Sequence, residues 1–177
     1  MELQRPLQGE PLALDLVNTE WNERGQRIDL LDLPAVRRAW LCSVGLGAVS
    51  DPGLRALRQA RTAIRHALEH PHDPTTLTAV NEVLSHGILR LVVTPSGVEQ
   101  QVEFDAEHWR AAWQAAENLT TLLRTKPERV RRCAHPECIL YFLDTTRQGT
   151  RRWCSMSTCG NRRKSQRHYR RHSKTSQ

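Results

Sequence analysis

Residues 133–159 read CAHPECILYFLDTTRQGTRRWCSMSTC. Four residues separate Cys133 from Cys138, four separate Cys154 from Cys159, and fifteen lie between the two pairs. This spacing is typical of a tetrahedral four-thiolate zinc site, because each short gap lets one turn of backbone aim two thiolates at the same ion. The longer gap is about what a small hairpin needs. Four cysteines would leave no open position on the metal, so the pattern predicts a structural site that performs no hydrolysis.

Other roles for these cysteines are disfavoured. Two disulfides could use the same residues, but the chain begins MELQRPLQGE, without an apolar signal stretch, so we expect a cytoplasmic protein with reduced thiols. His135 could replace one ligand, although two complete cysteine pairs favour a plain loop residue. The fifth cysteine, Cys42, follows Trp40 and Leu41, and we expect it to be a buried small hydrophobe.

The charge of the chain is divided unevenly. The 177 residues carry a formal net charge of +7. Residues 1–128 hold 13 Lys and Arg against 17 Asp and Glu, whereas residues 129–177 hold 13 against 2. Basic charge confined to one end favours a polyanion as the partner, since arginine matches phosphate geometry and binding releases counterions. A membrane surface is disfavoured because the basic end lacks an apolar face.

The first 127 residues are expected to form a mainly helical domain. Apolar residues recur at helical spacing in five segments, which are 12–21, 34–44, 51–68, 75–84 and 106–124. Asp32 with Pro34, Ser50 or Asp51, and Asp73 or Thr75 are the expected helix starts. The helix over 106–124 is expected to be the longest core element. Lys126 and Pro127 mark its end and the predicted domain boundary.

Two further features complete this domain. Residues 88–94 and 98–104 are rich in branched residues, and Pro95, Ser96 and Gly97 between them predict one β-hairpin that packs on the helices. The third helix carries four arginines at the spacing of a solvated face, so they are not interpreted as a nucleic-acid stripe. These arginines are Arg55, Arg58, Arg61 and Arg65.

Residues 128–177 are expected to form a small treble-clef-like module: a knuckle, a hairpin and a basic helix. Residues 139–144 and 150–153 are the expected hairpin strands, joined by turn formers at 145–149. Few helix breakers follow Asn161 until Ser173, and Asn161 or Thr158 is the expected cap. We expect the helix to contact nucleic acid through seven basic residues, which are Arg162, Arg163, Lys164, Arg167, Arg170, Arg171 and Lys174. A solubilising tail or a protein-binding helix is the alternative.

Four arginines next to the cysteines have a different expected role. Four thiolates around one Zn²⁺ carry a net charge of −2, so nearby cations are needed to balance the site. This requirement discounts the four as phosphate contacts. They are Arg131, Arg132, Arg151 and Arg152.

Two motifs carry a resemblance to known families. The run from Trp153 to Met156, followed by Cys-Gly-Asn-Arg at 159–162 and Lys164, resembles the CGNR zinc finger over about residues 129–173. The stretch LDLVNT at 14–19 is similar to the opening of ABATE, the helical domain usually fused to that finger. The resemblance implies a bacterial stress-induced transcription regulator whose finger binds DNA. It also implies that the four paired cysteines bind zinc and that residues 160–162 form the turn that starts the helix.

The function expected from these observations is that of a zinc-finger DNA-binding regulator. Its helical domain would dimerise or sense a small effector. Asp15, Asn18 and Thr19 are a candidate effector site, although helix capping or a buried hydrogen-bond network is the favoured role for them.

Other functions remain open. One is an RNA or single-strand binder that uses Trp153, Tyr141 and Tyr169 for stacking, and another is a zinc-dependent protein-interaction module. We expect no enzyme, because the chain has no Ser-His-Asp context, no phosphate-binding glycine loop and no His-Glu metal motif.

Overall fold

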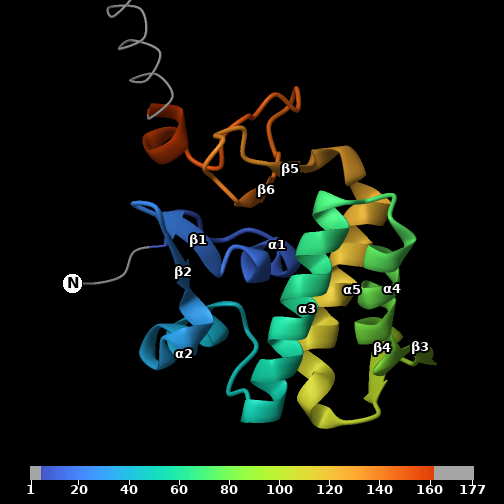
Figure 1. Cartoon of the computed structure of the whole chain (residues 1–177). Helices are drawn as coiled ribbons and strands as arrows, with labels where there is room; N and C mark the ends of the chain where they lie inside the picture. The colour runs from blue at the N-terminus through green and yellow to red at the C-terminus, as the bar shows by residue number, and fades with distance from the viewer. Residues whose placement is uncertain (1–4, 162–177) are drawn as a thin grey trace, which may run out of the picture.

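The computed structural model describes residues 5–161, in which helices make up most of the regular structure (Figure 1). The α-helices are α1 (Leu12–Val17), α2 (Pro34–Ser43), α3 (Asp51–Glu69), α4 (Pro74–Ser85) and α5 (Arg110–Thr125). Three antiparallel hairpins accompany them: β1 (Glu20–Glu23) with β2 (Gln26–Asp29), β3 (Gly87–Thr94) with β4 (Gly97–Phe104), and β5 (Val130–Arg132) with β6 (Tyr141–Leu143). The coarse fold class, mainly α with small β elements, is confirmed.

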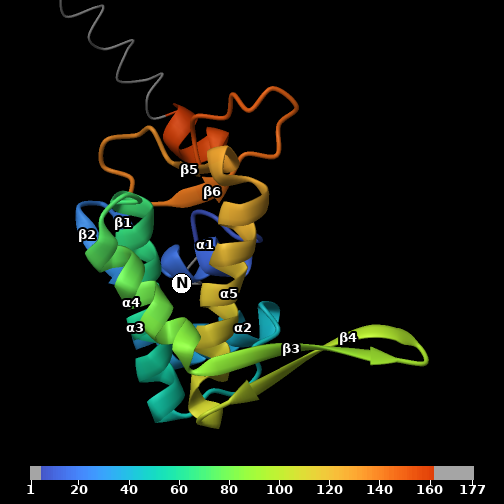
Figure 2. The same ribbon diagram turned by 90° about the vertical axis from the view of Figure 1, so that its right-hand side faces the viewer.

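The core lies where α1, α3 and α5 meet, with α4 on the outside of α3 and α5 (Figures 1 and 2). Small side chains on α3 and α5 let the two helices approach closely, because alanine adds little bulk between them. Fully buried leucine, isoleucine and valine side chains fill the rest of the core, among them Leu14, Leu16, Leu57, Ile64 and Leu119. None of the helices within residues 5–161 is long and apolar enough to span a bilayer.

The three expected helix starts are confirmed, and one of the expected caps is wrong. The Ser50 hydroxyl accepts a hydrogen bond from the Gly53 amide at the start of α3, and the Asp73 carboxylate accepts one from Thr75 at the start of α4. Helix α2 begins at Pro34 as predicted, but its N-cap is Leu33 and not Asp32. Helix α3 has 19 residues and α5 has 16, so the expectation that α5 is the longest core element is also wrong.

The helix predicted over residues 12–21 ends early. It stops at Val17, and the chain then turns back on itself as β1 and β2, with Trp21 opposite Ile28. Arg24 and Gly25 connect the strands with φ values of 49° and 82°. Two consecutive residues in the left-handed region make the tight turn that suits the twist of a hairpin, and glycine adopts this region without strain. This hairpin was missed because its strands have four residues each.

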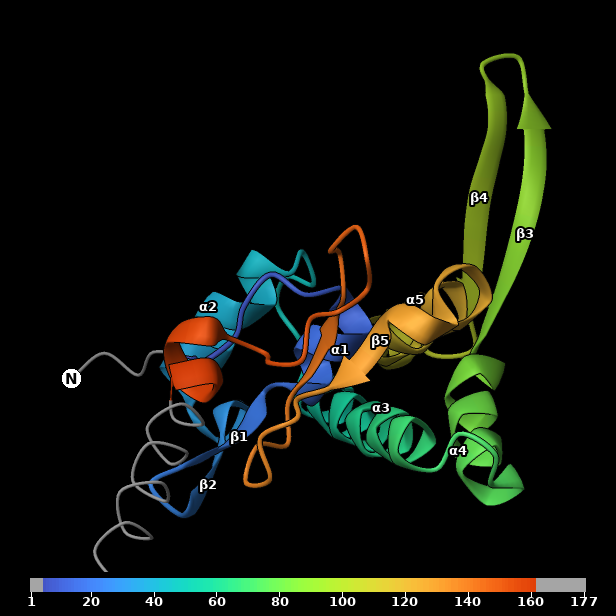
Figure 3. The same ribbon diagram turned by 90° about the horizontal axis from the view of Figure 1, so that it is seen from above.

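The β3–β4 hairpin forms where it was predicted, with its turn between Thr94 and Gly97. The expectation that it packs on the helices is wrong. Figures 2 and 3 show it projecting from the helical body, and several of its branched side chains are exposed. We refer to this hairpin, residues 87–104, as the arm.

Two further expectations about single residues are wrong. Arg61 and Arg65 were expected on a solvated face of α3, yet their exposed fractions are 5% and 7%. Both follow Leu57 at intervals of four residues, so they continue its buried row along the helix. Cys42 was expected in the core and is exposed.

The hairpin in the carboxy-terminal module differs from the predicted one. Strand β6 pairs with β5, not with residues 150–153. The reason is visible on the outer edge of β6, where Asn18 holds the backbone of Tyr141 and Glu10 accepts from the Leu143 amide. A third strand would need these same backbone groups.

Candidate metal centre

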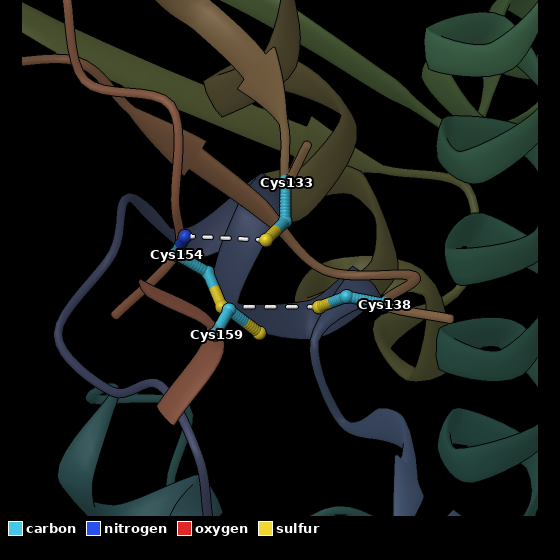
Figure 4. A group of neighbouring side chains, drawn as sticks. All are labelled: Cys133, Cys138, Cys154 and Cys159. Carbon is cyan, nitrogen blue, oxygen red and sulfur yellow. Dashed lines mark hydrogen bonds between the residues drawn. The ribbon is translucent and has the colours of Figure 1, made fainter. Parts of the chain in front are cut away.

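Local structure places each of the four paired cysteines. Cys133 follows β5, and its amide donates to the Leu140 carbonyl at 2.9 Å. Cys138 ends a tight loop that is closed by a hydrogen bond from its own amide to the His135 carbonyl at 3.0 Å. Cys154 lies at a bend, and Cys159 lies in the helical turn Met156–Gly160. The four side chains point toward one another (Figure 4).

The sulfur atoms are spaced as a tetrahedral metal site requires. All four Sγ atoms lie within 4.8 Å of one another. The distance from Cys154 Sγ to Cys138 Sγ is 3.8 Å, and that to Cys159 Sγ is 3.6 Å. A Zn–S bond of about 2.3 Å in tetrahedral geometry places two sulfurs roughly 3.8 Å apart. A disulfide would need about 2.05 Å, so the four thiols fit a shared cation and not two cystines.

The surroundings also fit bound thiolates. Cys133, Cys154 and Cys159 are buried, and Cys138 is half-buried. The Cys154 amide donates to Cys133 Sγ at 3.4 Å, and such bonds offset the charge of a thiolate.

The four thiols cannot all ionise side by side without a cation. Hydrogen bonds from Cys138 and Cys154 lower the pKa of the Cys133 thiol, so this thiol ionises first. The same contact with Cys133 raises the pKa of Cys138 and that of Cys154, and burial raises the pKa of Cys159. A divalent metal would supply the missing positive charge and allow all four to bind as thiolates.

Four arginines were expected to balance the negative charge of the site, and Arg151 is hydrogen-bonded to the backbone of one of the cysteines. Its guanidinium donates to the Cys154 carbonyl at 2.6 Å and to the Trp153 carbonyl at 3.0 Å. It also stacks on the Phe142 ring at 4.3 Å. Arg152 lies over Trp153, and Arg131 faces Asp144 at 3.9 Å.

His135 is buried in the knuckle loop and lies outside the sulfur cluster. Its Nδ1 accepts a hydrogen bond from the Glu137 amide at 3.4 Å, which holds the loop between the first two cysteines. The four sulfurs are brought together without it. Its role as a loop residue agrees with the favoured interpretation of the sequence.

The helical domain holds the module through polar side chains that sequence reasoning did not connect with it. The Asn18 side chain, at the end of α1, donates to the Tyr141 carbonyl at 2.8 Å and accepts from the Tyr141 amide at 2.9 Å. Glu10 accepts from the Leu143 amide at 2.8 Å and lies 3.6 Å from Arg151. A side chain of the amino-terminal domain thus meets the same arginine that contacts Cys154.

Arg65 makes a third connection. Its guanidinium donates to the Val17 carbonyl at 2.6 Å and to the Ile139 carbonyl at 3.1 Å, and it lies 3.3 Å from Glu20. It therefore joins α3, the end of α1 and the knuckle segment. The signal that could have predicted its burial was its position on the same side of the helix as Leu57. The residues that it contacts cannot be predicted from the helix alone.

The candidate effector residues form a buried network, as the favoured interpretation had it. The Trp40 indole donates to the Asp15 carboxylate at 2.8 Å, and Arg5 lies 2.8 Å from the same oxygen. The Thr19 hydroxyl donates to the Leu16 carbonyl at 2.7 Å and accepts from Arg61 at 2.9 Å. These groups are occupied by the protein itself, so they do not form an open site.

The structure does not test the expected nucleic-acid contacts. The seven basic residues from Arg162 to Lys174 lie outside the described residues. Of the aromatic residues expected to stack on bases, Tyr141 is buried with an exposed fraction of 3%, and Trp153 is half-buried beneath Arg152. Tyr169 lies outside the described residues.

The fold and the cysteine cluster define the class of protein: a helical domain that carries a small four-cysteine finger. The family described as "Putative stress-induced transcription regulator", ABATE, matches residues 10–126, and the CGNR zinc finger matches residues 129–172. The chain belongs to the ABATE family and carries a CGNR zinc finger. No curated protein matches the chain.

Proposed function

We propose that this protein is a zinc-dependent DNA-binding regulator of transcription. The observation that carries the proposal is the sulfur cluster next to the most basic part of the chain. Residues 129–177 hold 13 Lys and Arg against 2 Asp and Glu, and seven of the basic residues follow Cys159 directly. The family match to a stress-induced regulator supports the same function.

In this proposal the metal has a structural role. Cys133, Cys138, Cys154 and Cys159 would hold one Zn²⁺, and four thiolates leave no position for water or substrate. The bound ion supplies the cross-link that joins the knuckle to the turn Met156–Gly160. No catalytic step is assigned to it. A reducing compartment such as the cytoplasm keeps the four thiols available for the metal.

The basic residues after Cys159 would contact the phosphate backbone. Phosphate contacts position a protein on a duplex without reading sequence, and each releases counterions. With about six contacts, affinity is expected to fall roughly 1,000-fold between 50 and 200 mM salt. The contribution of the helical domain is to dimerise, which would present two fingers to two half-sites. Effector binding at Asp15, Asn18 and Thr19 is not part of the proposal, because these side chains are buried and paired within the domain.

The test is a titration of the zinc-loaded protein with duplex DNA of mixed sequence at several salt concentrations. The test variant replaces Arg163, Arg167 and Arg170 by Glu. The control variant makes the same replacement at three exposed arginines of the helical domain, which are Arg38, Arg55 and Arg124. Both variants change the net charge of the chain equally, so only the location of the charge differs.

We expect the test variant to bind duplex DNA at least ~100-fold more weakly and the control variant to bind within a few-fold of the original. Equal losses in the two variants, or binding that is insensitive to salt, would overturn the proposal. Tighter binding to single-stranded DNA or RNA than to the duplex would replace it with the single-strand function.

A further inference from the structure

The arm has two chemically different faces. In its register Leu89 is opposite Val102, Leu91 is opposite Gln100, and Val93 is opposite Val98. Side chains alternate along a strand, so these cross-strand pairs share one face. The other face holds Arg90 with Gln101 and Ile88 with Glu103. We call the first set the apolar face, made of residues 89, 91, 93, 98, 100 and 102.

The apolar face is open and carries no charge. The exposed fractions are 68% for Leu91, 83% for Val93 and 67% for Val98. Every charged residue of the arm lies on the opposite face, where Arg90 pairs with Glu103 at 3.2 Å. Glu99 on that face accepts from Thr94 near the turn. All three charged residues of the arm therefore lie on the face opposite the apolar one, which they share with Ile88 and Val92.

Among the described residues, the contacts that anchor the arm to the helices lie at its base. The Trp113 indole donates to the Gly87 carbonyl at 3.1 Å, and the Phe104 ring meets the Trp113 ring edge-on at 5.7 Å. A β-carbon at Gly87 would lie 2.6 Å from the Trp113 ring, so glycine permits this close approach. Beyond the base, the strands run away from the helices (Figures 2 and 3). An isolated two-stranded hairpin is marginally stable in water, so an arm of this length needs a partner for its apolar face.

The chemistry of the face selects the partner. A face without charge has nothing to offer a polyanion, and the reverse face has one Arg against two Glu, which excludes nucleic acid. Two copies of a charge-free face can meet about a twofold axis without like-charge repulsion, as an isologous interface requires. The same face would therefore suit a second copy of this chain.

We propose that the arm is a homodimerisation element, in which the apolar face of one protomer packs against the same face of its partner. The face spans five residues on each strand, 89–93 and 98–102, or about 16 Å at roughly 3.3 Å per residue. With six side chains on each face, two such faces bury at most an area at the low end of specific interfaces, roughly 1,200 Å² in total. We therefore expect a reversible dimer that forms through this contact and dissociates on dilution.

The experiment is sedimentation equilibrium of the full, zinc-loaded chain over a range of concentrations around the micromolar. Leu91→Glu introduces a carboxylate on the apolar face, and Gln101→Glu introduces the same group on the opposite face, next to Arg90. Because a twofold interface doubles each change, Leu91→Glu places one carboxylate from each protomer in an apolar contact. We expect Leu91→Glu to weaken dimerisation at least about tenfold and Gln101→Glu to leave it unchanged.

A second measurement distinguishes loss of the dimer from loss of the fold. In a Cys42→Ser background, Val93→Cys and Gln101→Cys each place one thiol on one face of the arm. Mild oxidation of the folded, zinc-loaded protein is expected to join two chains through residue 93 and not through residue 101. A protein that stays monomeric up to about 100 µM, or equal cross-linking at both positions, overturns the proposal. So does a dimer that Leu91→Glu leaves intact.

Discussion

The side-chain amide of Asn18 binds both backbone groups of Tyr141, donating to its carbonyl at 2.8 Å and accepting from its amide at 2.9 Å. The two residues are 123 positions apart in the chain. Asn18 thus occupies the outer edge of β6 as a neighbouring strand would. The finger is consequently part of the same hydrogen-bonded structure as the helical domain, and changes in either should be felt by the other.

The first prediction concerns this contact. Asn18→Ala leaves the amide and carbonyl of Tyr141 without partners in a buried position, where each unpaired group costs about 1–3 kcal/mol. We expect the free energy of unfolding, measured with urea and zinc present, to fall by about 3 kcal/mol. Asn22→Ala removes an exposed hydrogen bond to the Glu137 carbonyl and is the control. It should cost less than about 1 kcal/mol, and equal losses would refute the special role of Asn18.

The second prediction concerns the buried arginine that joins three segments. Arg65→Met keeps the length of the side chain and removes its bonds to the Val17 and Ile139 carbonyls. Because Glu20 then loses a buried partner, we expect a loss of about 3 kcal/mol in the free energy of unfolding. Arg55→Met is made on the exposed face of the same helix and should change stability by less than about 0.5 kcal/mol. Thermal and urea unfolding of the two variants would compare them, and similar stabilities would contradict the prediction.

The third prediction separates the clustered thiols from the isolated one. Cys138→Ser removes one of four sulfur ligands, whereas Cys42→Ser changes an exposed thiol outside the cluster. We expect metal analysis to find about one zinc per chain in the original protein and in Cys42→Ser. Cys138→Ser should lose most of the metal and unfold at a lower temperature. Full zinc content in Cys138→Ser would exclude a site built from these four residues.

The fourth prediction is a dependence of stability on pH. Burial acts to raise the pKa of Asp29, but the hydrogen bonds and charge of Arg61 outweigh it and hold the pKa below the ordinary value of 3.8. The stability that the ionised carboxylate contributes is therefore complete above 3.8 and is lost as the pH falls through the lowered value of the folded state. In Asp29→Asn this contribution is absent at every pH.

The difference in unfolding free energy between the two proteins is the quantity to measure. We expect it to be constant from neutral pH down to the ordinary carboxyl pKa and to shrink below it. Loss of metal in acid affects both proteins, so the difference isolates Asp29. A difference that persists unchanged in strong acid would show that the Asp29–Arg61 pair does not have the assigned role.

Much of the local structure was predictable because its causes are local. The spacing of Cys133, Cys138, Cys154 and Cys159 indicated a shared site, and the structure brings their sulfurs together. The caps at the starts of α3 and α4 depend on a hydroxyl or carboxylate two or three residues from the amide it binds. The turn between β3 and β4 was likewise readable from Pro95, Ser96 and Gly97.

Other predictions were wrong for a common reason. Arg61 and Arg65 lie on a helix whose charge pattern resembles a solvated face. Their burial is favourable only because Asp29, Glu20 and the Ile139 carbonyl lie next to them in the folded protein. The same holds for β6, whose outer edge is taken by side chains from the helical domain. Periodicity reports which side a residue faces, but it does not say what lies there.

The amino-acid sequence by itself determined the helices, the turns and the thiol spacing, since each follows from contacts among residues close together in the chain. Tertiary structure decided the pairing of Asn18 with Tyr141, the burial of two arginines and the projection of the arm. These depend on groups that only folding brings within hydrogen-bonding or packing distance. The free-energy cost of burying a charge or of exposing an apolar face depends on which groups lie opposite it.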